Sequence, residues 1–404
     1  MAQQKELKFN RVLGFIKNKK VKCLIAFLFI IVIVFNVSSV VLSHKNLYFS
    51  ADYWKRFPKL EKLYLNSQYV NKHPIWQRDE VILAYAGGAF IKGINPVYVL
   101  PDTPPLGKYL IGVSAVVFNN ENIIILLSAI LSLILLFILG SQIFSSKLLA
   151  LVPPLLFSFE PIFKNQLIYT PLLDLFQLVF LLLSFIAFNK ALSSKKSFIF
   201  LLLANVFVGM YIATKFFITG AVIEAAFYFV LLIKKDIRRL LELTLTFPIA
   251  VLILLLSYIR VFAFGYTINK FLGIQKWVFL YHKSLLILPL SVWPLILLNK
   301  WYVWYGNKPV VADSQWIITW PFITMLTFAT AVLGVLRKIK LNSNLWILIA
   351  WTIFYFAFFS FGEISSRYFV ILIPILYIIA FYGVVEVLKQ IFLHHATERL
   401  KKLL

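Results

Sequence analysis

The segment Cys23-Leu-Ile-Ala-Phe-Leu-Phe-Ile-Ile-Val-Ile-Val-Phe-Asn-Val-Ser-Ser-Val-Val-Leu42 decides the fold class of this chain, because it is predominantly apolar and carries no charge. About 20 such residues form a helix long enough to cross the hydrocarbon core of a bilayer. Similar runs recur at 123–139 and 369–385. The first run is longer than the apolar core of a cleaved signal peptide and follows a basic amino end, so we predict a retained transmembrane helix.

The composition indicates the same class of protein. Hydrophobic residues make up 61% of the 404 residues and charged residues only 14%, whereas soluble domains usually carry about a quarter charged residues. We therefore predict an all-α polytopic membrane protein that forms a single domain over 1–404. The most plausible location is the plasma membrane of a prokaryote, or the endoplasmic reticulum membrane in a eukaryote.

The net charge is +24, but this excess does not indicate a nucleic-acid partner. The basic residues fall in short clusters between apolar runs, as the positive-inside rule expects for cytoplasmic loops. Anionic lipid headgroups are the simpler partner, with a lipid-linked phosphate as a second candidate. The single cysteine, Cys23, excludes an intrachain disulfide, and the histidines lack metal-ligand spacing. We expect no metal site and no cofactor.

Threading the chain with a cytoplasmic amino end predicts ten transmembrane helices and two large external loops, at 44–121 and 263–314. This threading places the basic clusters 234–239 and 337–340 inside. The apolar segments 105–118 and 285–298 are short, so we assign them to interfacial helices in the external loops. The predicted spans are 22–43, 122–140, 147–163, 171–190, 197–215, 217–233, 240–262, 315–336, 345–361 and 367–388.

An acidic pair, Asp79 and Glu80, follows the first span and begins a predicted helix that runs toward Ile91. Adjacent helical residues point about 100° apart, so only one of the two can face a given substrate. Stabilisation of the helix dipole is the structural alternative. The segment 102–108 then forms a proline-stiffened turn that ends in Lys108, whose alternative role is to snorkel to the membrane interface.

A second acidic site combines Glu160, Gln166 and Asp174. Its structural alternative is a solvated turn with a helix-capping carboxylate. Two cations, Lys215 and Arg367, lie within about a turn of the predicted outer ends of their spans, where a charge needs a partner or a polar cavity. Interfacial anchoring is the alternative, but two cations near an acidic pair favour a phosphate site.

The order of these motifs resembles the protein O-mannosyltransferase family, within the GT-C class of polytopic glycosyltransferases that use polyprenyl-phosphate sugars. The resemblance extends from about residue 20 to 390. Thr103 replaces the family's usual histidine, and the segment 306–309 has an extra lysine. The matching motifs are Asp79-Glu80, Pro104-Pro-Leu-Gly-Lys108, Gln166 with Leu172-Leu-Asp174, and the segment from Tyr281-His-Lys through Leu290-Ser-Val-Trp-Pro-Leu to Trp301-Tyr-Val-Trp-Tyr.

This resemblance implies transfer of a sugar, with mannose as the first candidate, from a polyprenyl-phosphate donor to an acceptor hydroxyl on the outer side. Asp79 would be the general base, with Glu80 beside it. Arg367, Lys215 and Lys108 would bind the donor phosphate. The second acidic site would bind the acceptor, which could be a protein or a glycan.

Two other functions stay open at this point. A transporter or flippase of a lipid-linked or anionic substrate would place charges near the bilayer midplane and show broken helices in paired halves. Here the charges gather at one face. A non-catalytic membrane subunit could use the same loops to bind a partner.

Overall fold

The computed structural model describes residues 19–68, 75–303 and 310–403. The basic segment before Lys19, His73 and the motif at 306–309 lie outside the described residues. Within them the chain is almost entirely helical, with one two-stranded sheet.

Five described helices are long and apolar enough to cross a membrane, judged by length and composition. Seven shorter helices form the other apolar segments of the bundle. The polytopic all-α membrane fold is therefore confirmed, whereas the number of ten spans stays a prediction. The five are α2 (Lys19–Ser43), α7 (Ile123–Ile143), α11 (Asp174–Ser193), α14 (Ile237–Ser257) and α20 (Ile373–Leu403). The seven are α6 (Leu106–Phe118), α8 (Lys147–Ala150), α9 (Val152–Phe159), α12 (Ser197–Ile212), α13 (Ile218–Ile233), α18 (Thr319–Val335) and α19 (Leu345–Phe359).

The remaining elements are short or lie within the predicted external loops. They are α3 (Lys45–Phe49), α4 (Tyr53–Ser67), α5 (Asp79–Ile91), η1 (Pro96–Tyr98), α10 (Pro161–Ile168), α15 (Ile259–Ala263), α16 (Ile268–Ser284), α17 (Val292–Leu298), β1 (Trp301–Tyr302), β2 (Val310–Val311) and η2 (Ser366–Val370). The strands pair antiparallel, with Trp301 opposite Val311.

Three predicted spans differ from the observed helices. The span at 147–163 is divided into α8, α9 and the start of α10, because Pro161 lacks an N–H and begins a new helix after Glu160. The span at 240–262 ends at Ser257. Arg367 does not begin the last span: it lies in the 3₁₀ helix η2, and the long helix starts at Ile373.

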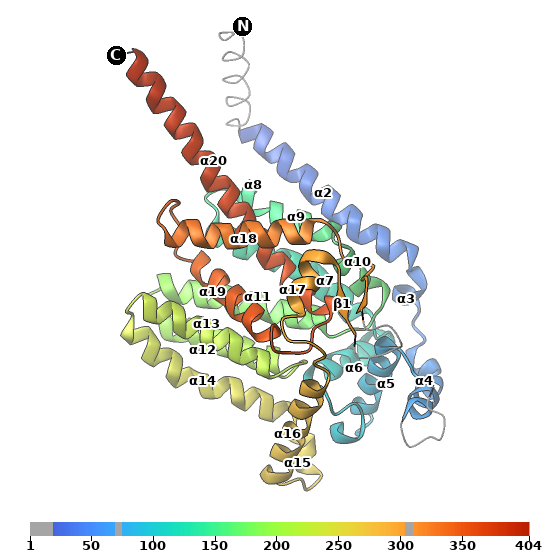
Figure 1. Cartoon of the computed structure of the whole chain (residues 1–404). Helices are drawn as coiled ribbons and strands as arrows, with labels where there is room; N and C mark the ends of the chain where they lie inside the picture. The colour runs from blue at the N-terminus through green and yellow to red at the C-terminus, as the bar shows by residue number, and fades with distance from the viewer. Residues whose placement is uncertain (1–18, 69–74, 304–309, 404) are drawn as a thin grey trace.

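Connections predicted on one side of the membrane come together in the structure. The Asn342 side chain, between α18 and α19, donates a hydrogen bond to the Ile143 carbonyl at the end of α7 (2.7 Å). Arg239, near the start of α14, bonds to the Ser194 carbonyl after α11 (3.5 Å). In Figure 1 the turn between α13 and α14 lies at the left, and α4, α5 and α6 lie together at the opposite, right-hand end. The side of the membrane that each of these ends faces stays a prediction.

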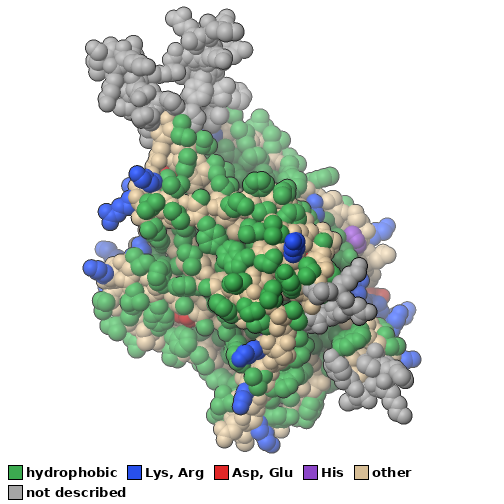
Figure 2. All heavy atoms as spheres, in the orientation of Figure 1, with side chains coloured by type: hydrophobic (Ala, Val, Ile, Leu, Met, Phe, Trp, Pro, Cys, Tyr) green, Lys and Arg blue, Asp and Glu red, His purple; other side chains and the backbone are tan. Residues whose placement is uncertain are grey.

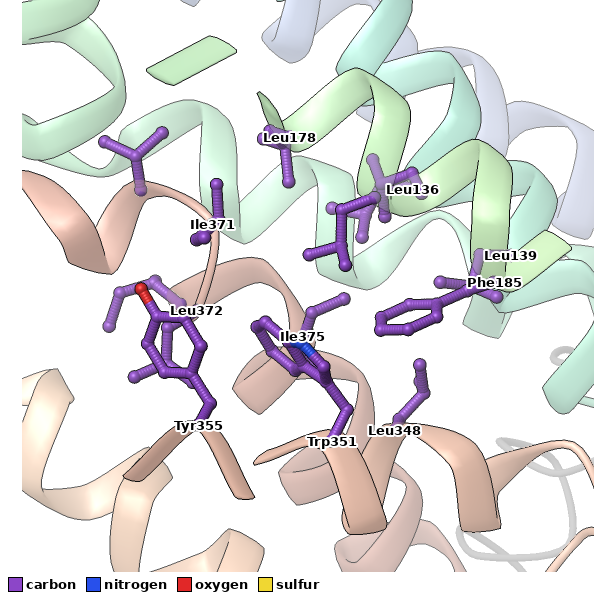
Figure 3. Packing of buried hydrophobic residues seen from close by; sticks show 14 of the residues in the cluster. Leu136, Leu139, Leu178, Phe185, Leu348, Trp351, Tyr355, Ile371, Leu372 and Ile375 are labelled. Carbon is purple, nitrogen blue, oxygen red and sulfur yellow. The ribbon is translucent and has the colours of Figure 1, made fainter. Parts of the chain in front are cut away.

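The core is centred on α11, which contacts α7, α12 and η2. Leu178 and Phe185 of this helix are fully buried, with Trp351 and Ile375 from the carboxyl-terminal helices beside them (Figure 3). By contrast, α2 at the periphery exposes large side chains such as Phe35 (68%). Apolar side chains cover much of the surface (Figure 2), as a bilayer-facing surface requires.

Candidate functional site

Two adjoining cavities lie at the end of the bundle that carries α5 and α16. One, of about 230 Å³, is lined partly by charged side chains, among them Asp79, Asp102 and Arg367. The other, of about 190 Å³, is lined mainly by apolar and aromatic side chains. The two cavities share one polar wall. Its residues are Thr103, Asp174, Lys215, His282, Glu363 and Tyr368.

Asp79 and Glu80 diverge at the start of α5. The Arg78 guanidinium binds the Glu80 carboxylate (2.7 Å) and lies over the Tyr169 ring (4.4 Å). Glu80 is not among the residues that line the cavities, whereas Asp79 lines the more polar one. The sequence predicted that only one member of the pair would face a substrate, and of the two only Asp79 lines a cavity.

Asp79 pairs with Arg367, which is 288 residues away in sequence. Arg367 Nη1 and Asp79 Oδ2 are 2.5 Å apart, and 54% of the Asp79 side chain stays exposed. Burial by itself would raise the pKa of Asp79. The Arg367 guanidinium, with a smaller contribution from Lys215, overcomes that effect and holds the pKa below its ordinary value. The carboxylate is therefore ionised at neutral pH.

A second ion pair joins Lys215 to Asp174 behind the first pair. Asp174 is the first residue of α11, and Lys215 lies in the turn between α12 and α13. The Asp174 side chain is only 3% exposed, and Arg367 Nε lies 3.5 Å from its Oδ2 atom. Lys215 Nζ also lies over the Tyr368 ring, 4.7 Å from its centre. Two cations and two carboxylates from four separate segments thus form one network.

His282, Glu363 and Tyr368 line the cavities but were not among the predicted site residues. His282 Nδ1 lies 3.0 Å from a Glu363 carboxylate oxygen, and the Tyr368 hydroxyl donates to the other oxygen (2.7 Å). His282 Nε2 faces the Asp102 carbonyl oxygen at 3.2 Å. Two features of the sequence could have identified these residues. His282 belongs to the motif Tyr281-His-Lys, which resembles the mannosyltransferase family, and Glu363 and Tyr368 lie close to Arg367 in the sequence.

Asp102 is a further polar group on the wall of the more polar cavity that was not among the predicted site residues. One of its carboxylate oxygens is buried without a hydrogen-bond partner. Burial raises the pKa of Asp102, although Lys108 and His282 act in the opposite direction. Asp79 and Asp102, which both line this cavity, therefore differ in proton affinity.

Lys108, Glu160 and Gln166 lie apart from both cavities. The buried Lys108 ammonium donates to the carbonyls of Leu100 (2.5 Å) and Thr103 (2.7 Å). It holds the 100–108 turn in place rather than presenting its charge to the cavity. Glu160 accepts hydrogen bonds from the Trp320 indole (3.0 Å) and the Tyr377 hydroxyl. Gln166 is buried in α10, so of the predicted second acidic site only Asp174 faces the cavities.

The site offers two cations that could contact an anion. Among the described residues no three His, Cys, Asp or Glu side chains are grouped so that they could hold a metal ion. Arg367 and Lys215 are both partly accessible, at 29% and 11% of their side-chain surface. They lie where a phosphate could contact both.

Comparisons with known proteins give a family-model match and similar solved structures. The family model for dolichyl-phosphate-mannose-protein mannosyltransferase matches residues 102–262, and no curated protein sequence gives a match. ArnT from Cupriavidus metallidurans bound to undecaprenyl phosphate is similar in fold, with a TM-score of 0.56, 16% identity and coverage of 82% of this chain. The similarity covers 59% of the ArnT chain, so this chain spans less than two thirds of its length.

An oligosaccharyltransferase from Archaeoglobus fulgidus, in its apo form, also matches, with 14% identity, a TM-score of 0.48 and coverage of 87% of this chain and 52% of its own. An integral membrane location is confirmed by the apolar helices and the family model. The predicted resemblance is confirmed as well: residues 102–262 match the family model for dolichyl-phosphate-mannose-protein mannosyltransferase, and the chain has a fold similar to that of ArnT.

Proposed function

We propose that this protein is a membrane glycosyltransferase that moves a sugar, with mannose as the first candidate, from a polyprenyl-phosphate donor to an acceptor hydroxyl on the outer side. One observation carries the proposal: Asp79, Asp174, Lys215 and Arg367 meet at the boundary between a cavity with charged walls and an aromatic one. A lipid-linked sugar phosphate needs this combination of surfaces, because its two ends differ in polarity.

The donor phosphate is assigned to the shared wall of the two cavities. Arg367 can bind two phosphate oxygens through its planar fork, whereas Lys215 acts as a point charge. On the far side of this wall the apolar cavity is lined by aromatic rings, including Phe216, Phe279 and Phe358. These rings suit the isoprenoid segment next to the phosphate, and the sugar would then occupy the cavity that contains Asp79.

In the transfer step the acceptor hydroxyl gives its proton to a carboxylate oxygen of Asp79. The acceptor oxygen forms a bond to the anomeric carbon as the bond from that carbon to the phosphate oxygen breaks. The electron pair of the broken bond stays on the phosphate, and Arg367 and Lys215 stabilise the charge that develops there. The products are the glycosylated acceptor and the polyprenyl phosphate.

The contact between Asp79 and Arg367 has a role in this scheme. In the structure the guanidinium that would bind the phosphate is bound to the carboxylate that would act as base. An arriving phosphate competes with Asp79 for Arg367, and the released carboxylate becomes free to accept a proton.

The test is a transfer assay with purified protein in detergent, a radiolabelled polyprenyl-phosphate mannose and a pool of Ser/Thr-rich peptides. We expect label to appear in peptide. A second series with other polyprenyl-phosphate sugars and with glycan acceptors identifies the sugar and the acceptor. Absence of transfer from every polyprenyl-phosphate sugar, in protein that keeps its fold, would refute the proposal.

No comparison with known proteins supports the transporter or flippase alternative. The ionic network also gathers at one end of the bundle, where α5, α11 and η2 begin, rather than midway along the helices. If the protein were a transporter, its binding site would therefore lie at one end of the helix bundle rather than near the middle.

A further inference from the structure

His282 has two hydrogen-bond partners, and both of them only accept. Its Nδ1 atom faces the Glu363 carboxylate at 3.0 Å, and its Nε2 atom faces the backbone oxygen of Asp102 at 3.2 Å. A neutral imidazole has one N–H and one bare nitrogen, whereas the protonated ring has two N–H groups. Only the protonated ring satisfies both contacts when Glu363 is ionised. The geometry therefore favours a positively charged His282.

The surroundings of the ring hold it in this orientation. The Phe216 ring packs edge-on against it, with 4.5 Å between ring centres, and Phe216 directly follows Lys215. The Tyr368 hydroxyl donates to the Glu363 oxygen that His282 leaves free. The titratable and charged groups that line the two cavities around the ring are Asp79, Asp102, Asp174, Tyr211, Lys215, Tyr281, Lys283, Tyr355, Glu363, Arg367 and Tyr368.

The position of His282 matters because it lies on the wall shared by the two cavities, together with Lys215. The side chains of His282 and Glu363 are only 14% and 6% exposed. A charged pair this far from bulk water interacts more strongly with a third charge than a solvated pair does. An anion bound at the wall would therefore experience the charge of the histidine.

We propose that His282 is a third cationic contact for the phosphate of the lipid donor and that Glu363 is the residue that positions it. The inference rests on the proposed function, since it concerns the same donor. When the phosphate binds, the Nε2–H group leaves the Asp102 carbonyl and donates to a phosphate oxygen. The proton stays on the ring, and no covalent bond changes.

Histidine differs from arginine and lysine because an unperturbed imidazole changes its charge near neutral pH. A protonated ring at position 282 would add affinity for an anion, and a neutral ring would not. The phosphate gains charge over a similar range and so acts in the opposite direction. A comparison of variants separates these two effects.

The experiment measures binding of undecaprenyl phosphate to the full-length protein in detergent, between about pH 5.5 and 8.5, a range that spans the titration of a typical histidine. For His282→Gln we expect affinity to fall about tenfold at the acid end, as for loss of one charge-assisted hydrogen bond. At the alkaline end the variant and the wild type should converge. His44→Gln is the matched control, because this histidine lies outside both cavities and its ring bonds to the Val40 carbonyl of α2.

Two further variants separate a role in binding from a role in folding. His282→Lys carries a charge at every pH in this range, so it should keep more affinity than His282→Gln and lose the dependence assigned to the ring. Glu363→Gln keeps the shape of the positioning residue but removes its charge. In that variant the loss of affinity should begin at a lower pH, a shift that a merely structural role would not produce.

Wild-type affinity and an unchanged pH profile in folded His282→Gln protein would overturn the inference. If His282→Gln does not fold, an unchanged profile in Glu363→Gln would overturn it. Failure of the wild type to bind undecaprenyl phosphate at any pH would instead count against the proposed donor, and so against the proposed function itself.

Discussion

Asp79 and Glu80 are neighbours in the sequence but have different partners in the structure. Asp79 lies on the cavity wall beside Arg367, and Glu80 is held by Arg78. A base must lie within hydrogen-bond reach of the acceptor, and at these two positions only Asp79 lines the cavity. The two carboxylates are thus distinguished by where their side chains lie rather than by their chemical type.

We expect Asp79→Asn to reduce the transfer rate by roughly 10² to 10⁴-fold, the range for loss of a general base. Glu80→Gln should cost much less. Donor-dependent initial rates at matched protein concentration measure both effects. The matched control is Asp52→Asn, which removes a carboxylate that pairs with Arg56 in α4. Equal rates for Asp79→Asn and Asp52→Asn would exclude Asp79 as the base.

Arg367 contacts carboxylates on two other segments, so its shape matters as well as its charge. Arg367→Lys retains the charge but loses the planar fork, and we expect slower donor-dependent transfer. Arg367→Ala should be slower still. Lys215→Ala should raise the donor KM and leave the acceptor KM unchanged, because Lys215 belongs to the shared phosphate wall. Wild-type kinetics in Arg367→Lys would assign Arg367 to membrane anchoring instead.

The pH dependence of transfer follows from the same ion pair. Because Arg367 keeps the pKa of Asp79 below its ordinary value, the base stays ionised until the pH falls through that lowered pKa. In Arg367→Ala the main cause of the lowering is gone, so the pKa of Asp79 rises. The residual activity of that variant should therefore be lost at a higher pH than in the wild type. Rate profiles for the two proteins test this, and coinciding acid limbs would contradict it.

At the scale of elements, α5 positions Asp79 at the cavity, and the orientation of this helix depends on close packing against α4. A methyl group at Gly88 would overlap the Tyr53 hydroxyl and the Phe57 ring. The same two helices share a stacked pair, Phe57 with Tyr85, at 5.5 Å between ring centres. A small residue at position 88 is what permits this approach.

Gly88→Ala should lower the free energy of unfolding by about 1–3 kcal/mol, the range for overpacking, and should also slow transfer by shifting α5. Thermal unfolding in detergent measures the first effect. The matched control is Gly273→Ala in α16, where an added methyl group meets no atom within 4 Å. That change should be neutral or slightly stabilising, because alanine favours a helix. Equal unfolding midpoints for the two variants would contradict the packing argument.

At the scale of the whole molecule, the placement of the site depends on the orientation of the bundle in the membrane. We expect α4 to face outward and the start of α14 to face the cytoplasm. In a Cys23→Ser background, an impermeant thiol reagent applied to intact cells should label Lys62→Cys and spare Arg238→Cys, both at exposed positions. The reverse pattern would invert the topology and place the cavities inside.

The sequence by itself determined that this is a helical membrane protein. The length of an apolar run is a local property, and it decides whether a helix can cross the bilayer. The start of α5 at Asp79 and its end at Ile91 could also be predicted, since the acidic pair and the apolar run that follows are local signals. The choice of Asp79, Lys215 and Arg367 rested on residue type, position and family resemblance, and all three line the cavities.

Only the tertiary structure decided which charges act on one another. Arg367 and Asp79 are 288 residues apart, and His282 and Glu363 are 81 apart, so no local pattern couples them. The same packing keeps Glu160 away from the cavities, because its carboxylate accepts hydrogen bonds from Trp320 and Tyr377 on distant segments. A charge in a mostly apolar chain must find a partner somewhere. Which partner it finds depends on how the helices pack, and that is settled by contacts between segments that are distant in the sequence.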